Sequence, residues 1–135
     1  MALIVWDHRL ETGHGKMDEQ HESLVEILNR LDGAMKQGKG KDEVGGILIL
    51  LKDFTVSHFA MEERLMEEHP YAGSARHQQV HAELVAQLAD LVDRFEQGRA
   101  AMTLPVMNFL EDWLVKHIQE EDLQFARELQ GQGSR

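Results

Sequence analysis

Apolar residues recur at three- and four-residue intervals along four long segments of this chain, and no other feature restricts the possible fold as strongly. Such spacing places the apolar side chains on one face of an α-helix. Glycine clusters and the two prolines separate the segments, and Thr103 is a suitable N-cap for the last of them. The pattern therefore predicts four amphipathic helices, at about residues 18–37, 41–68, 73–97 and 104–129.

Short connections join these four segments, so consecutive helices are expected to run in opposite directions. We therefore predict an all-α fold, an antiparallel up-down-up-down four-helix bundle with an N-terminal arm. A chain of 135 residues is long enough for one domain with a core of its own. We expect a single domain over 1–135, with the arm at about 1–17 and the bundle at about 18–130. Trp6 and Leu10 of the arm are expected to pack across the bundle.

The composition excludes several classes of function. A formal net charge of −10 argues against a nucleic-acid partner or an anionic membrane surface, because both require a basic face. The sequence has no cysteine, so disulfides, thiolate zinc sites and iron–sulfur clusters are excluded. The apolar run at 2–6 is too short for a signal peptide or a membrane span. We expect no membrane insertion, a cytoplasmic location and a monomer, and the sequence indicates no particular protein partner.

Five of the eight histidines lie on the apolar stripes of the predicted helices. In an antiparallel bundle the first and third helices begin where the second and fourth end, so all five histidines fall at one end. A chain with this many histidines is expected to contain roughly half of one histidine pair spaced by four residues by chance. The prediction of a metal site therefore rests on the complete set and not on one pair. The candidate metal ligands are His21, His58 with Glu62, His77 with His81, and His117 with Asp122.

The step from His117 to Asp122 does not fit an ideal helix. Residues four apart share a helix face, so the other pairs can serve one centre. Five residues turn through roughly 500°, which points Asp122 about 140° away from His117. Glu121 is the better-aligned carboxylate by this geometry alone. For Asp122 to join the cluster, the helix must widen locally into a π-bulge or the side chain must reach across.

The donor types narrow the choice of metal. Imidazoles and carboxylates without thiolates suit iron, zinc, manganese, copper or nickel. Seven ligands exceed one tetrahedral zinc site, but they suit two six-coordinate metals that are bridged by carboxylates. Two ferrous ions nearly balance the charge of two carboxylates and one hydroxide, so burial in an apolar bundle is feasible. All five histidines must then be neutral.

The residues of this pattern resemble those of the hemerythrin family, in particular the single-domain bacterial hemerythrins, over nearly the full chain. Besides the seven candidate ligands, the resemblance rests on Trp6…Thr12-Gly13-His14…Met17-Asp18-Glu19-Gln20-His21 and on Trp113-Leu114…His117-Ile118. It implies a cofactor of two iron ions with a bridging oxo or hydroxo ligand. One iron is held by three histidines, the other by two, and two carboxylates bridge them. The resemblance implies that His77, His81 and His117 hold the first iron and that His21 and His58 hold the second. It implies that Glu62 and Asp122 are the bridging carboxylates.

By the same resemblance, dioxygen binds reversibly as a hydroperoxide at the iron with fewer protein ligands, and Asp122 rather than Glu121 is the bridging residue. Reversible binding needs a dry pocket that admits oxygen and limits protonation. Candidates for this oxygen pocket lie within one helical turn of a candidate ligand: Leu24, Phe59, Trp113, Leu114 and Ile118. His8, His14 and His69 are interpreted as non-ligands, because they lie on the arm or beside a proline.

Three other functions remain open at this stage. The first is a di-iron enzyme acting on oxygen, peroxide or nitric oxide. Five neutral imidazoles with only two carboxylates should stabilise the high-valent states for oxygen cleavage less well than the carboxylate-rich sets of ferritin-like enzymes, which favours a carrier, store or donor of dioxygen. The second is a sensor of oxygen, redox state or iron, and the third is a zinc-stabilised structural bundle.

Overall fold

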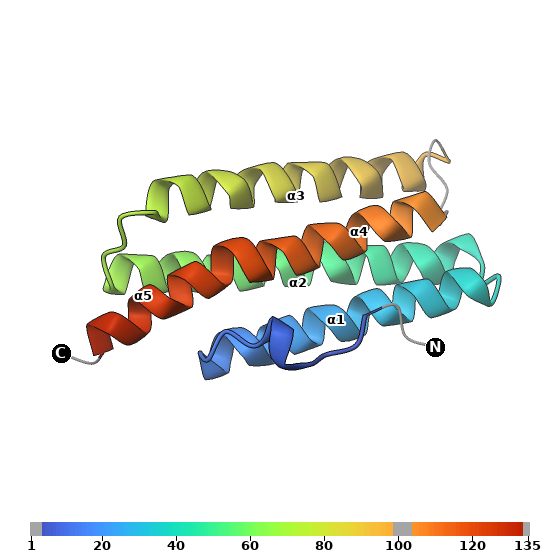
Figure 1. The fold of residues 1–135 in the computed structure, drawn as a ribbon. Helices are drawn as coiled ribbons and strands as arrows, with labels where there is room; N and C mark the ends of the chain where they lie inside the picture. The colour runs from blue at the N-terminus through green and yellow to red at the C-terminus, as the bar shows by residue number, and fades with distance from the viewer. Residues whose placement is uncertain (1–3, 99–103, 134–135) are drawn as a thin grey trace.

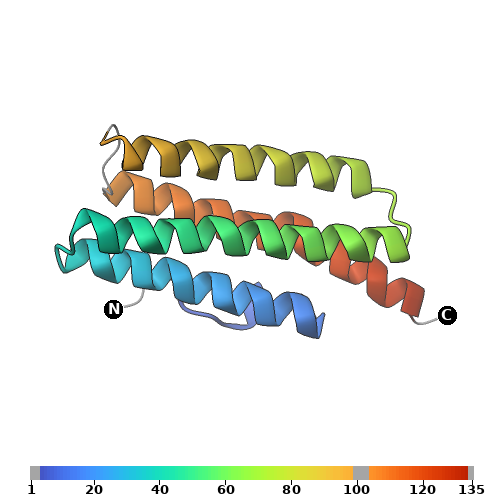
Figure 2. The ribbon, with the colours of Figure 1, turned by 180° about the vertical axis from the view of Figure 1, so that it is seen from behind.

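The computed structural model describes residues 4–98 and 104–133, and these residues form helices and connecting segments with no strand. The long helices are α1 (Gly15–Lys36), α2 (Lys41–Glu68), α3 (Ser74–Glu96), α4 (Leu104–His117) and α5 (Leu123–Gly133). Helices α4 and α5 follow one another along a single rod, which lies beside the other three (Figure 1). The same antiparallel arrangement is visible from behind (Figure 2). The predicted all-α four-helix bundle is therefore confirmed.

The helix boundaries agree with those predicted except at two places: α5 runs to Gly133, four residues beyond the predicted end at 129, and α1 starts early. That helix begins at Gly15, three residues earlier than the predicted boundary at 18. The ring nitrogen Nδ1 of His14 accepts a hydrogen bond from the backbone N–H of Met17, so histidine acts as the N-cap here. Histidine is not among the usual N-cap residues, which explains why the sequence pattern missed this start. The predicted cap at Thr103 lies outside the described residues.

The N-terminal arm is fastened to the bundle at two places. The side chain of Asn29 on α1 accepts from the backbone N–H of Ile4 at 2.9 Å and donates to the carbonyl of Ile4 at 2.8 Å. Nearer the site, the carboxylate of Asp18 accepts from the backbone N–H and the hydroxyl of Thr12. Leu10 is buried, and Trp6 packs against the core in a partly buried position, as predicted.

The fourth helical rod of the bundle changes from α-helix to π-helix between His117 and Asp122, where their five-residue spacing does not fit an ideal α-helix. Between α4 and α5 the chain forms a π-helical turn, η2 (Ile118–Asp122). The backbone N–H of Leu123 bonds to the carbonyl of Ile118, five residues earlier, so residues five apart come onto one face. The predicted local widening is confirmed, and the side chain of Asp122 is fully buried in the bundle.

Two apolar clusters lie on either side of the candidate ligands along the helices. The larger one fills the middle of the bundle and includes Leu28, Leu48 and Leu110, all fully buried. A smaller one, rich in methionine, includes Met17 and Phe125 and lies toward the end where α2 finishes and α3 begins. Burial of apolar surface on both sides stabilises the helices, and the histidine-bearing level between the two clusters is itself almost entirely buried.

Helix α2 is long and apolar enough to cross a membrane by length and composition alone. In the structure it lies between α1 and α3, and 44% of its most apolar stretch is buried inside the bundle. A core helix of a bundle passes the same test, because it is apolar on much of its surface. Gly45 near its start faces Phe95 of α3, and an added Cβ would lie 3.4 Å from the ring, in ordinary van der Waals contact.

Candidate metal centre

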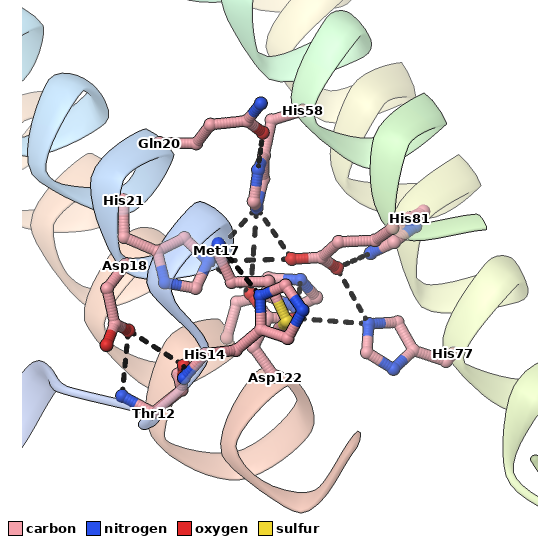
Figure 3. A network of polar contacts seen from close by, with 12 residues as sticks. Thr12, His14, Met17, Asp18, Gln20, His21, His58, His77, His81 and Asp122 are labelled. Atoms are coloured by element: carbon pink, nitrogen blue, oxygen red, sulfur yellow. Dashed lines mark hydrogen bonds and ion pairs between the residues drawn. The ribbon is translucent and has the colours of Figure 1, made fainter. Parts of the chain in front are cut away.

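The structure brings all seven candidate ligands together at one level of the bundle. They come from all the helical rods, and each is buried, the most exposed being His117 at 6%. Figure 3 shows the rings of His21, His58, His77 and His81 turned toward one another and toward Asp122. The donor atoms form two groups, and within each group all donor atoms lie within 4.8 Å of one another. Both groups include the carboxylates of Glu62 and Asp122. The first group adds His77, His81 and His117, and the second adds His21 and His58.

One side of the cluster contains two histidines. The Nε2 atom of His21 lies 2.7 Å from Oδ2 of Asp122 and 3.5 Å from Oε2 of Glu62. The Nε2 atom of His58 lies 2.7 Å from the same Oε2 and 3.8 Å from the same Oδ2. The two Nε2 atoms are 3.0 Å apart. Two nitrogens and two oxygens therefore surround one point.

The other side contains three histidines. The Nε2 atom of His77 lies 3.2 Å from Oε1 of Glu62 and 3.0 Å from Oδ1 of Asp122. His81 approaches Oε1 of Glu62 at 3.1 Å. His117 approaches Oδ1 of Asp122 at 3.1 Å. Three nitrogens and two oxygens surround this second point, one donor more than on the side with two histidines.

Each carboxylate thus divides its two oxygens between the two sides of the cluster. Oε2 of Glu62 and Oδ2 of Asp122 face the two histidines, while Oε1 and Oδ1 face the three. A carboxylate placed in this way can bridge two cations, one on each oxygen. The geometry can hold a pair of metal ions with five protein donors for one and four for the other.

The two buried carboxylates of the cluster and the imidazoles beside them shift one another's pKa values. Burial opposes protonation of His21 and His77, but hydrogen bonds to the carboxylates outweigh it and raise the pKa of each from 6.5 to about 9. Burial also opposes protonation of His58, but hydrogen bonds to Asp122 and Glu62 outweigh it and raise the pKa of His58. Burial favours neutral Glu62 and Asp122, yet the surrounding imidazoles hold the pKa of both carboxyl groups well below their usual values. In the metal-free protein the two buried carboxylates are therefore ionised and paired with protonated imidazoles, and metal ions would take the place of those protons.

Several buried polar atoms of the cluster lie close to one another, but within the described part of the chain they have no partner placed for a well-formed hydrogen bond. They include Oε2 of Glu62, Oδ2 of Asp122 and Nε2 of both His81 and His117. Buried polar atoms in folded proteins are nearly always satisfied. Cations between these atoms would satisfy all of them at once, so the donor set fits a pair of metal ions.

Two side chains that sequence reasoning did not identify contact the outward nitrogens of the histidines. Oε1 of Gln20 lies 2.6 Å from Nδ1 of His58, and Oε2 of Glu63 lies 3.4 Å from Nδ1 of His81. The only signal in the sequence is that each precedes or follows a candidate ligand directly, a position that carries no information about which other helix it faces. Their contacts depend on how the helices pack.

The residues considered as alternatives or as non-ligands lie outside the cluster. Glu121 pairs with Arg76 at 2.9 Å, so its carboxylate is directed to α3 and away from the histidines. His8 and His69 are exposed, and His14 caps α1. The geometric preference for Glu121 on an ideal helix is wrong here, because the π-helical turn brings Asp122 inward in its place.

The five residues predicted for an oxygen pocket are all buried in the larger apolar cluster, next to the candidate ligands. Phe59 stacks on the ring of His81 with a centroid distance of 3.8 Å and meets His117 edge-on at 5.2 Å. The other four are also buried: Leu24, Trp113, Leu114 and Ile118. Their burial in this cluster places apolar surface beside the candidate ligands.

An open groove of about 390 Å³ lies between α3 and the rod formed by α4 and η2. Its lining includes Leu84 and Phe109 on the outside and Trp113 and His117 deeper in. The indole N–H of Trp113 is buried and makes no hydrogen bond within the described residues. The groove brings solvent against His117, the least buried of the candidate ligands.

Comparison with known proteins gives consistent matches over nearly the whole chain. The family model described as hemerythrin HHE cation binding domain matches residues 12–129. The chain is 36% identical to a bacteriohemerythrin of Stenotrophomonas maltophilia over 126 residues, covering 93% of this chain and 81% of that protein. It is also 36% identical to a bacteriohemerythrin of Methylococcus capsulatus, covering 90% and 93% respectively. A myohemerythrin of Riftia pachyptila is 27% identical, with 93% and 92% covered.

Solved structures agree with the sequence matches. A crystal structure of wild-type hemerythrin superposes with a TM-score of 0.86 and 35% identity, covering 95% of this chain and 98% of that one. A single-residue variant of hemerythrin gives a TM-score of 0.89 at 34% identity, covering 96% and 98%. The likeness extends through the arm and all the helical rods, since almost none of either chain is left unmatched.

Proposed function

This chain belongs to the hemerythrin family, and we propose that it binds dioxygen reversibly at a di-iron centre as a carrier, store or donor. The observation that carries the proposal is the division of the carboxylate oxygens: each of Glu62 and Asp122 presents one oxygen to two histidines and the other to three. This arrangement suits two bridged metals and leaves them unequal.

We assign the seven ligands as follows. The metal with five protein donors is held by His77, His81, His117, Glu62 and Asp122; the metal with four is held by His21, His58, Glu62 and Asp122. With one bridging oxo or hydroxo oxygen, the first reaches six donors and the second only five. Six-coordinate iron on the second side then has one position for an external ligand. The iron pair, when bound, supplies the two electrons that dioxygen takes up on binding.

The protein's contribution to reversibility is to keep water and protons away from that position. Phe59, Trp113 and Leu114 are buried apolar or aromatic side chains of one cluster beside the ligands, and Leu24 and Ile118 extend it. A dry wall of this kind excludes the water that would displace or protonate a reduced oxygen species. Phe59 also approaches the ring of His58, a ligand of the metal with four protein donors, at a centroid distance of 5.8 Å, and this contact supports its place in the wall.

The donor set also favours binding over catalysis. Neutral imidazoles outnumber carboxylates by five to two in the assigned site, so less anionic charge is available to stabilise the oxidised states that oxygen cleavage requires. The relatives are named hemerythrins, and none of those compared bears an enzyme name. We therefore propose that the chain is not an enzyme.

The surroundings of the protein are proposed from its surface. The net charge of −10 and the burial of α2 within the bundle support a soluble protein without a nucleic-acid partner or membrane insertion. We propose the cytoplasm as its compartment and a monomer as its state, since the like charge of each copy opposes association.

The test is an oxygen cycle on the iron-loaded protein. Purified protein is loaded with ferrous iron, exposed to air and then deoxygenated under vacuum while the visible spectrum is recorded. We expect an oxygen-dependent absorption band that disappears under vacuum and returns on re-exposure over several cycles. Rapid consumption of oxygen with a reductant would instead favour a di-iron enzyme, and a protein that retains zinc in preference to iron would favour a structural bundle.

A further inference from the structure

The outward ring nitrogens of the five histidines among the candidate ligands have unequal partners. Nδ1 of His58 faces the neutral amide oxygen of Gln20 at 2.6 Å, and Nδ1 of His81 faces the carboxylate of Glu63 at 3.4 Å. The corresponding nitrogens of His21, His77 and His117 are buried and make no hydrogen bond within the described residues. Each side of the centre therefore has one histidine with an outer partner, and the two partners differ in charge.

We propose that Gln20 is the positioning residue of the metal on the two-histidine side, and that its neutral charge sets that metal apart from its neighbour. This inference rests on the proposed function, because it concerns the metal with the open position. Gln20 lies one residue before His21 on α1, yet it contacts His58 on α2. Figure 3 shows the amide oxygen directed at the His58 ring and the amide nitrogen directed away from it.

The first part of the argument concerns the orientation of the ring. When Nε2 of an imidazole binds a metal, the remaining proton is on Nδ1, which must find an acceptor. Oε1 of Gln20 is such an acceptor at a short distance, and the side chain is half-buried, so water competes weakly for it. Nδ1 of His21 has no comparable acceptor among the residues that the structure describes. On this side of the centre, Gln20 therefore provides the hydrogen bond that holds an imidazole in its ligating tautomer and orientation.

The second part concerns charge. A carboxylate that accepts the Nδ1 proton makes the ring a stronger electron donor to its metal, while an amide oxygen does so less. On the three-histidine side the acceptor is Glu63, a carboxylate at longer range. On the two-histidine side a neutral acceptor keeps the donor strength lower, which favours the ferrous state of the metal that meets dioxygen. Glutamine at this position, rather than glutamate, supports reversible binding.

The experiment compares three single variants of the full chain. Gln20→Leu removes the acceptor, and Gln20→Glu keeps an acceptor while adding a negative charge. Gln79→Leu is the matched control, since Gln79 is exposed on α3 between two candidate ligands. For each variant, ferrous iron affinity is measured against a competing chelator, thermal unfolding is measured without metal, and the reduction potential of the iron-loaded protein is measured by titration at an electrode.

We expect Gln20→Leu to lower the affinity for the more weakly bound iron by roughly 10- to 100-fold, the range for lost outer partners of metal ligands. Gln20→Glu should retain wild-type affinity but show a lower reduction potential and faster autoxidation. Gln79→Leu should match the wild type in all three measurements. Rescue of affinity by glutamate and not by leucine identifies acceptance of the Nδ1 proton as the property that matters.

Two results would overturn the inference. One is wild-type iron affinity in Gln20→Leu. The other is equal loss of metal-free thermal stability in both Gln20 variants with an unchanged reduction potential in Gln20→Glu, which would make the residue purely structural. Failure of the proposed function is separate: in that case the wild-type protein itself binds no iron pair or shows no reversible oxygen spectrum.

Discussion

The middle of the bundle and its histidine-bearing end are equally buried but chemically opposite. In the middle, Leu28, Leu48 and Leu110 are fully buried members of the larger apolar cluster, and their side chains carry no polar atom that needs a partner. At the other level, His21, Glu62 and Asp122 are also fully buried, yet several polar atoms there have no hydrogen bond. The comparison teaches that the apolar side chains in the middle of the bundle need no ligand. At the histidine-bearing level, cations would satisfy the buried polar atoms. The scaffold and the site should therefore respond differently to mutation and to pH.

Among the proposed substitutions, Asp122→Asn should distinguish the histidine-bearing site from the apolar middle of the bundle most clearly. This change keeps the shape of the side chain but removes the charge on the oxygens that face both groups of histidines. We expect iron affinity to fall by more than about 100-fold, beyond the effect of an outer partner. Iron content is measured by elemental analysis after desalting. Glu121→Gln is the control, because Glu121 pairs with Arg76 and should leave iron content at the wild-type level.

The converse effect is expected in the middle of the bundle. Leu48→Ala removes a fully buried side chain and should lower the free energy of unfolding by about 2–5 kcal/mol. Because Leu48 lies ten residues before His58, about 15 Å along an ideal helix, the folded variant should keep its full iron content. Denaturant unfolding and elemental analysis test both halves of the prediction. Loss of iron from a variant that remains folded would contradict the separation of the two regions.

Between about pH 6.5 and 9, the pH dependence of the stability of the metal-free protein should come from histidines of the site. The pKa values of His21 and His77 rise from 6.5 to about 9 on folding. A raised pKa stabilises the fold fully below the unfolded value, and the contribution is lost as pH increases through the folded value. The melting temperature of the metal-free protein should therefore fall between about pH 6.5 and 9. The iron-loaded protein, with neutral ligated imidazoles, should not show this fall, because metal affinity increases with pH.

The smallest effect is expected in the wall between the two regions. Leu114 is buried beside the ligands, and Leu114→Asn should admit water to the oxygen position without removing a ligand. We expect autoxidation to become several-fold faster, with iron content unchanged. The lifetime of the oxygenated form is followed by its visible absorption. An unchanged lifetime would show that Leu114 does not line the oxygen pocket.

Much of this fold could be predicted from the sequence, because helix periodicity and short connections determine which side chains share a face. The departure at Asp122 could also be predicted: five residues do not return to the same face of an ideal helix, and the π-helical turn resolves the conflict. The partners Gln20 and Glu63 could not be predicted, since each lies beside a candidate ligand in sequence but contacts a histidine of another helix. Their roles depend on the rotation and depth of packed helices, which periodicity does not specify.

The most direct test of the central claim is a crystal structure of the iron-loaded protein with anomalous data collected at the iron absorption edge. We predict two iron peaks inside the bundle. One should contact His77, His81 and His117 and the other His21 and His58, with Glu62 and Asp122 between them. A single iron peak, or peaks away from the two carboxylates, would contradict the account.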